Sequence, residues 1–253
     1  MRRVITRLLC IFPFEESFFR EHGVPATYIG HPLAGRVRPS MDRAEFFRKH
    51  RLAADRPLIA VLPGSRRSEA ARHLPLLVEA ARKLNAWRAM SFLLAASRSA
   101  GMAFFVNRIT GSGIQVIEGE TYDVLAHADL ALVASGTATI EAALLGTPMV
   151  TFYRVHPASW FLGKWLLDVP FLSMVNLLAE RRIVPELIQA DCTAVRLAAE
   201  AQELLESPER TARMRDDLMS LKDRLAGGEG ALDRAAEVIE ELLLMERTGV
   251  RNG

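Results

Sequence analysis

The stretch 132–141 reads Leu132-Val133-Ala134-Ser135-Gly136-Thr137-Ala138-Thr139-Ile140-Glu141. It predicts a buried strand, a turn of small residues, and a helix that carries a carboxylate one turn in. Backbone N–H groups and hydroxyls then gather at a helix N-terminus, where the helix dipole favours negative charge. A diphosphate fits this position, and Glu141 is placed to accept hydrogen bonds from ribose hydroxyls. The same residues also suit a plain capped helix with Ser135 or Thr137 as N-cap.

A second loop of this kind lies upstream, where Leu62-Pro63-Gly64-Ser65-Arg66 follows a predicted strand. Glycine at position 64 lets the backbone approach a ligand closely. Ser65 can bond a phosphate, and Arg66 offers a planar, permanently charged fork that suits one. Glu69 is placed to pair with Arg66 or to help start the following helix. The alternative is an ordinary strand-to-helix loop with a surface arginine.

Short apolar runs alternate with helical patterns along the chain. This alternation predicts an α/β fold with a parallel sheet and right-handed crossovers. Ligands of such sheets bind outside the carboxyl ends of the strands, where both loops lie. Strands are expected at 7–12, 26–29, 58–62, 91–95, 114–117, 130–134 and 149–152, and helices at 14–22, 71–85, 99–108, 121–127 and 137–145, with three more in 193–245.

The charge and cysteine content of the chain limit the classes of function that fit it. The chain has 253 residues and a net charge of +2, so its bulk charge does not imply a nucleic-acid partner. Its two cysteines, Cys10 and Cys192, have no metal-ligand spacing and fit a reduced, cytoplasmic protein. Arginines crowd residues 36–56, as a solvated face or as a patch for anionic lipid or phosphate.

Three further segments carry candidate site residues. Glu118 follows a predicted strand, in a loop of the kind that holds a nucleotide base or simply caps a helix. The apolar segment 156–174 contains Trp160, Phe161 and Trp165 and indicates either a core helix or a contact with acyl chains or a membrane. Three polar residues stand in an otherwise apolar region and either face a ligand-binding cleft or cap helices: Asn176, Glu186 and Gln189.

The ordered set of motifs closely resembles one family. The motifs are Pro13-Phe14-Glu15, Gly30-His31-Pro32-Leu33, the 62–66 loop with Glu69, the 135–141 stretch, and Asn176-Leu177-Leu178-Ala179 with Glu186 and Gln189. Together they resemble lipid-A-disaccharide synthase over about residues 7–245. The resemblance implies a glycosyltransferase-B fold, in which two Rossmann-like domains face each other across a cleft.

The resemblance also implies an activity and partners, and it implies that no metal and no cofactor take part. The family transfers 2,3-diacylglucosamine from UDP-2,3-diacylglucosamine to 2,3-diacylglucosamine 1-phosphate, with inversion, at the cytoplasmic face of the inner membrane. Arg66 and the helix N-terminus would stabilise the leaving UDP, and Glu141 would hold the ribose. Asn176 and Gln189 would line the donor side, and the segment around Trp160 would lie near acyl chains or the membrane.

The family's N-terminal acceptor domain and its general base have no counterpart in this sequence. We therefore expect residues 1–36 to be a remnant of that domain with a linker, 37–192 to be the nucleotide-sugar-binding domain, and 193–253 to be C-terminal helices. The partners expected for the protein itself are a second copy, as a homodimer, or a separate N-terminal polypeptide. Two other functions stay open: a non-catalytic UDP-binding subunit, and another UDP-N-acetylglucosamine enzyme such as an epimerase.

Overall fold

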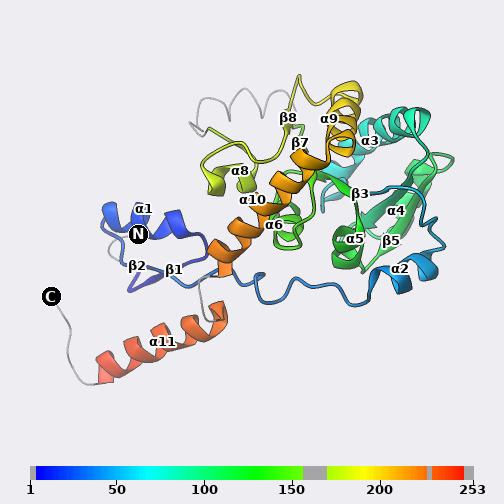
Figure 1. The fold of residues 1–253 in the computed structure, drawn as a ribbon. Helices are drawn as coiled ribbons and strands as arrows, with labels where there is room; N and C mark the ends of the chain where they lie inside the picture. Colours follow the sequence, from blue (N-terminus) through cyan, green and yellow to red (C-terminus); the bar gives the residue numbers. More distant parts are fainter. Residues whose placement is uncertain (1–3, 156–169, 227–229, 248–253) are drawn as a thin grey trace. The chain divides into compact units, whose positions relative to one another are not determined.

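A computed structural model describes residues 4–155, 170–226 and 230–247 (Figure 1). The chain folds as two compact units. The larger unit comprises 38–219, and the smaller unit comprises the described residues of 1–37 and 220–253. The division of the chain into an acceptor-domain remnant, a nucleotide-sugar-binding domain and C-terminal helices stays a prediction.

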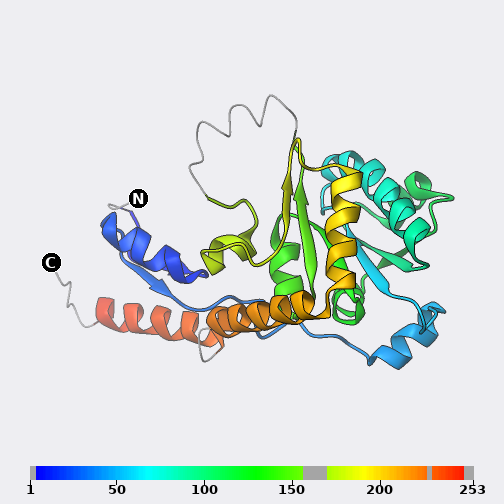
Figure 2. The same cartoon turned by 45° about the horizontal axis from the view of Figure 1, so that its top comes forward.

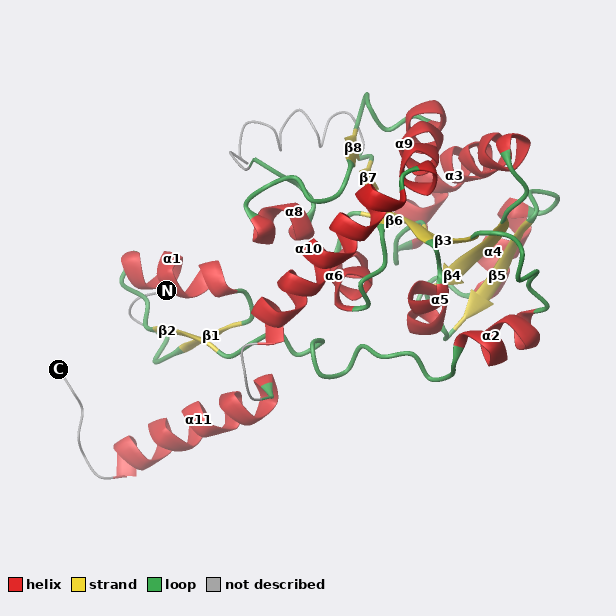
Figure 3. Cartoon of the chain, in the orientation of Figure 1, coloured by secondary structure: helices red, strands yellow, loops and turns green. Residues whose placement is uncertain are grey.

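The larger unit is built on a parallel sheet of six strands in the order β5-β4-β3-β6-β7-β8 (Figure 3). The predicted α/β class is therefore confirmed. Every residue of β3 and β6 is buried, as expected for central strands that helices cover on both faces. The strands are β3 (Leu58–Leu62), β4 (Ser91–Ala96), β5 (Ile114–Glu118), β6 (Leu130–Ala134), β7 (Met149–Tyr153) and β8 (Glu186–Ile188).

Helices cover this sheet. Helices α3 and α9 pack against each other, and α9 also contacts β6 and β7, whereas α5 contacts β3 and β4 and α6 contacts β6 and α8 (Figure 2). The helices of the larger unit are α2 (Arg43–His50), α3 (Arg67–Trp87), α4 (Met102–Ile109), α5 (Thr121–His127), α6 (Thr137–Leu144), α8 (Met174–Ala179), α9 (Ala194–Glu206) and the first part of α10 (Pro208–Ala226).

The strand order reverses between β3 and β6. From β3 the chain steps outward to β4 and β5, then returns through α5 to β6 on the other side of β3. Open parallel sheets bind ligands at such a reversal, outside the carboxyl ends of the strands. Both candidate loops of the sequence analysis therefore start from neighbouring strands.

The smaller unit contains a parallel pair of short strands, β1 (Leu8–Cys10) and β2 (Ala26–Tyr28), joined by α1 (Pro13–Glu21). It also holds α11 (Ala231–Arg247) and the end of α10. The backbone N–H of His31 donates to the carbonyl of Leu225 at 2.8 Å, and the Tyr28 hydroxyl donates to the carbonyl of Arg224 at the same distance. Segments nearly two hundred residues apart in sequence thus share one unit.

The predicted strands and helices agree with the structure except for small shifts at their ends. Three short elements were not predicted: α2, α8 and β8. For α2 the signal was present, because Asp42 precedes it as an N-cap and accepts a 2.8 Å hydrogen bond from the backbone N–H of Glu45. The buried pair Phe46 and Phe47 anchors this helix among its many charges. β8 has three residues, too few for a periodic pattern.

Candidate functional site

The loop between β6 and α6 presents an open helix start. Gly136 is the N-cap, with a φ of +153°, and no side chain caps the helix, so the expectation that Ser135 or Thr137 is the cap is wrong. Gly136 and Thr137 are exposed. Thr139 is buried, and its hydroxyl donates to the carbonyl of Gly136 at 2.7 Å. The first backbone N–H groups of α6 thus have no side-chain cap to compete with an anion.

Ser135 itself is tied to the chain that follows β7. Its hydroxyl donates to the carbonyl of Leu172 at 3.0 Å. The carboxylate of Glu186 in turn accepts hydrogen bonds from the backbone N–H groups of Leu172 and Ser173. Glu186, one of the polar residues that the sequence analysis singled out, therefore holds the segment that positions Ser135.

The loop between β3 and α3 depends on its glycine. Gly64 has a φ of +111°, and a Cβ atom there would lie 2.5 Å from Oε2 of Glu69, whose side chain covers it. Within the described residues, Glu69 forms no ion pair with Arg66, contrary to one expectation. Ser65 and Arg66 are exposed, and the Ser65 carbonyl accepts from the hydroxyl of Ser97 at 2.9 Å. The Arg66 guanidinium is therefore accessible to a ligand.

A pocket of about 470 Å³ opens beside these loops, at the carboxyl ends of β4 and β5. Glu141 reaches it from α6. Arg98 follows β4, and its guanidinium packs over Gly119, where a Cβ atom would lie 3.4 Å from it. The pocket thus combines cationic and anionic groups, as a ligand with both phosphate and hydroxyl groups requires. Its lining residues are Arg38, Ser40, Ala96, Ser97, Arg98, Gly119, Glu120, Thr121, Tyr122, Asp123 and Glu141.

Glu141 has a perturbed acidity. Burial raises the pKa of its carboxyl above the ordinary value of 4.5, and a hydrogen bond with Tyr122 opposes this rise. A half-buried carboxylate at the wall of a pocket is costly without partners, and ribose hydroxyls would supply hydrogen-bond donors to it.

Glu120 is fixed from behind by α2. His50 Nε2 lies 2.9 Å from its Oε2, and Lys49 Nζ lies 3.0 Å from its Oε1. Burial alone would raise the pKa of Glu120, but the hydrogen bonds and charges of His50 and Lys49 outweigh it and lower the pKa. The neighbouring Asp123 is buried and accepts from the hydroxyl of Ser40 at 2.9 Å. One wall of the pocket is therefore held rigidly.

A sequence model of the lipid-A-disaccharide synthetase family matches residues 1–240. The chain belongs to this family. It is similar to the lipid-A-disaccharide synthase of Solibacter usitatus, with 59% identity over 243 residues, or 96% of this chain. The match spans 64% of that relative's length.

Solved structures with low identity share the fold. The chain is similar to a UDP-GlcNAc 2-epimerase from Neisseria meningitidis bound to UDP-GlcNAc, with a TM-score of 0.62 and 14% identity over 93% of this chain and 60% of that one. It is also similar to a sucrose-phosphate synthase from Thermosynechococcus elongatus, with a TM-score of 0.57 and 16% identity over 94% of this chain and 58% of that one. The expected glycosyltransferase-B type of fold is confirmed.

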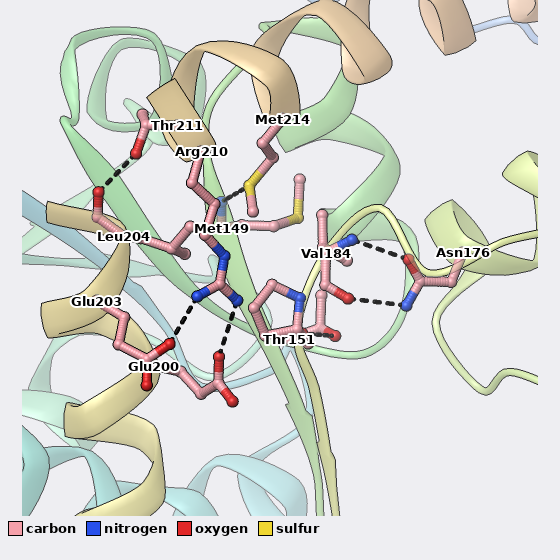
Figure 4. Close-up of polar contacts among 11 residues, drawn as sticks. Met149, Thr151, Asn176, Val184, Glu200, Glu203, Leu204, Arg210, Thr211 and Met214 are labelled. Carbon is pink, nitrogen blue, oxygen red and sulfur yellow. Dashed lines mark hydrogen bonds and ion pairs between the residues drawn. The ribbon is translucent and has the colours of Figure 1, made fainter. Parts of the chain in front are cut away.

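Two residues that the lipid-A-disaccharide synthase resemblance places on the donor side make hydrogen bonds within the chain. Asn176 is fully buried; its Nδ2 donates to the carbonyl of Val184 at 3.0 Å, and its Oδ1 accepts from the backbone N–H of Val184 at the same distance (Figure 4). Gln189 accepts from the backbone N–H of Val155 at 2.7 Å. This geometry favours roles in shaping the chain around β8 rather than in touching the donor.

The other residues expected in the lipid-A-disaccharide synthase site either do not line the pocket or lie outside the described part of the chain. Glu118 is exposed at the end of β5, and the residues after it line the pocket instead. Trp160, Phe161 and Trp165 lie outside the described residues. In the part of the chain that the structure describes, no helix is both long and apolar enough to cross a bilayer. Nor does any group of three or more His, Cys, Asp or Glu side chains there form a metal site.

Sequence reasoning about the lipid-A-disaccharide synthase motifs missed several residues. Arg38, Arg98 and Glu120 line the pocket, and His73 is buried behind the β3–α3 loop. Arg98 had one local signal, because it comes directly after a predicted strand, where ligand-binding residues of parallel sheets gather. Arg38 lies in the arginine-rich run 36–56, which the sequence indicated as a solvated face or as a patch for anionic lipid or phosphate. His73 had no local signal, since its place depends on contacts between distant segments.

Proposed function

We propose that this chain binds the donor UDP-2,3-diacylglucosamine and supports transfer of its sugar to 2,3-diacylglucosamine 1-phosphate, forming the lipid A disaccharide. The single observation that carries the proposal is the pair of open loops, after β3 and β6, at the point where strand order reverses. Membership in the lipid-A-disaccharide synthase family supports this donor over that of an epimerase.

In this proposal the diphosphate lies at the start of α6, near the exposed backbone of Gly136 and Thr137. Negative charge grows on the UDP as the glycosidic bond to it breaks. The backbone N–H groups at the helix N-terminus are fixed before the reaction, so they stabilise that charge without reorganising, and the exposed Arg66 guanidinium adds a positive charge to the site. Glu141 accepts hydrogen bonds from the ribose, and the pocket beside it receives the nucleoside.

Titration calorimetry of the full chain with UDP tests the proposal. We expect saturable binding that Arg66→Ala and Glu141→Ala each weaken by about ten-fold or more, because each removes a hydrogen bond to a charged group. Arg88→Ala is the matched control, since Arg88 is an exposed arginine just beyond the other end of α3. Wild-type affinity in both site variants, with the folded state verified by circular dichroism, would overturn the proposed site.

A membrane contact is the second part of the proposal. Trp160, Phe161 and Trp165 are the side chains we expect to meet acyl chains or the bilayer at the cytoplasmic face of the inner membrane. Replacing Trp160 and Trp165 by alanine should reduce cosedimentation with anionic vesicles. The third tryptophan, Trp87, is 37% exposed and serves as the control. Equal sedimentation of the wild type and the double variant would contradict this contact.

A further inference from the structure

A second pocket, of about 360 Å³, lies at the edge of the sheet in the larger unit. It is bordered by residues 181–187, α9 and α10. Glu186, the first residue of β8, lines it. Because β8 runs parallel to β7, this pocket is at the amino end of the strand, whereas the nucleotide site is at the carboxyl ends of the strands. The two sites are therefore separate.

Arginine dominates the walls of this second pocket. Five guanidinium groups face it, against three carboxylates. The floor includes the buried side chains of Ile183, Val184 and Met214. Guanidinium groups around an apolar floor suit a ligand with a compact anionic group. The arginines are Arg181, Arg182, Arg196, Arg210 and Arg213.

The carboxylates of the pocket already have partners. Asp217 pairs with Arg181, with a shortest N–O distance of 2.5 Å. Glu200 pairs with Arg210 at 3.4 Å, and Figure 4 shows the Arg210 fork divided between Glu200 and Glu203. Glu186 accepts two backbone hydrogen bonds. Few acceptors are left over for a cation.

The donors, in contrast, are in surplus. Arg182 and Arg213 are exposed and form no ion pair or side-chain hydrogen bond within the described residues. Each guanidinium carries five N–H donors and no acceptor. Arg196 pairs with Asp191, and Arg210 pairs with Glu200 and Glu203, so these two arginines are already compensated. The donors left to bind an anion are therefore those of Arg182 and Arg213.

We propose that this pocket binds a phosphate group, carried by a phosphate ester or a diphosphate, with Arg182 and Arg213 making the direct contacts. The paired arginines Arg181 and Arg210 shape the walls, because their carboxylate partners hold them in place. The proposal stands independently of the nucleotide site at the other end of the sheet. A phospholipid headgroup and a soluble phosphate ester share this chemistry.

Calorimetric titration of the full chain with inorganic pyrophosphate, in the presence of saturating UDP, tests the pocket. UDP fills the proposed nucleotide site, so the remaining heat reports other sites. We expect R182Q/R213Q to weaken pyrophosphate binding by about ten-fold or more, since it removes two charge-assisted contacts. The control R88Q/R215Q removes the same charge from exposed positions outside the pocket and should leave the affinity within about two-fold.

Absence of pyrophosphate binding to the wild type, or equal weakening in both double variants, would overturn the proposal. UDP affinity measured on R182Q/R213Q should stay unchanged, which separates failure of this pocket from failure of the nucleotide site. Sedimentation with phosphatidylcholine vesicles containing phosphatidic acid then distinguishes the ligand sources. Weaker vesicle binding by R182Q/R213Q than by R88Q/R215Q identifies a lipid headgroup, and equal vesicle binding by the two variants identifies a soluble phosphate ester.

Discussion

Nδ1 of His73 lies 2.8 Å from the carbonyl oxygen of Pro63, inside the larger unit. The ring is fully buried, and its Nε2 lies 3.3 Å from the backbone nitrogen of Arg154. With the proton on Nδ1, His73 donates to the residue before Gly64 and accepts from the chain after β7. One side chain thus links the β3–α3 loop to the end of β7.

Replacing His73 by alanine should lower the free energy of unfolding by about 2–4 kcal/mol, because it leaves a cavity and two unpaired backbone groups. Urea unfolding followed by circular dichroism measures this. Lys83→Ala on the same helix is the control, since Lys83 is exposed and should change stability by less than about 0.5 kcal/mol. An unchanged urea midpoint in His73→Ala would show that the link is dispensable.

Gly64→Ala should destabilise the chain and weaken UDP binding together. The new Cβ atom would clash with the Glu69 side chain. The alanine would also have to adopt a positive φ, which residues with a side chain disfavour. Gly111→Ala is a matched control, because Gly111 also has a positive φ, of +74°, but nothing lies within 4 Å of its added Cβ. We expect a lower melting temperature for Gly64→Ala than for Gly111→Ala, and partial recovery in Gly64→Ala/Glu69→Ala. Equal melting temperatures would mean that the Glu69 contact carries no cost.

UDP affinity should depend on pH through Glu141. Its pKa is raised by burial, so the carboxylate gains a proton as pH falls through a value above 4.5 and then accepts ribose hydroxyls less well. Calorimetry between pH 5 and 8 should show affinity falling toward acid more steeply in the wild type than in Glu141→Gln. The UDP phosphates titrate equally in both titrations, so the difference between the profiles isolates Glu141. Parallel profiles would exclude this carboxylate as the titrating group.

The pairing of Glu120 with Lys49 and His50 should stabilise the folded chain at neutral pH and lose this effect in acid. Its pKa is lowered below 4.5 in the folded state, so its contribution is fully present above the unfolded pKa and is lost as pH falls through the folded pKa. The partly exposed pairing is worth up to about 1 kcal/mol. Glu120→Gln should therefore unfold at a lower urea concentration than the wild type at pH 7, and this difference should shrink as the pH falls below 4.5. A difference that stays constant as the pH falls would argue for packing rather than charge.

The elements that the sequence predicted best are those with a strong local signal. The run 58–62 is apolar throughout and forms a central strand, and the small residues 135–138 mark the start of α6. The two candidate loops could then be located, because each comes directly after a strand that the sequence predicts. Glu141 lines the pocket, and its role as the ribose-binding residue stays a prediction.

Other positions depended on contacts that no local pattern encodes. Asn176 was expected to meet a ligand, yet its amide groups bond to residues 183 and 184 within a buried turn. His50 and Glu120 are 70 residues apart and meet only because α2 packs against α5.

The sequence by itself determined the alternation of strands and helices, the two small-residue loops after β3 and β6, and the family. Hydrophobic periodicity, glycine residues and capping residues affect the structure over a few neighbouring positions, so they can be recognised in the sequence without knowledge of the fold. Tertiary structure alone decided which side chains line the pocket with Glu141, that Asn176 is turned inward, and that five arginines face one pocket between α9 and α10. Those outcomes depend on strand order and helix packing, which bring together residues whose separation in sequence carries no periodic signal.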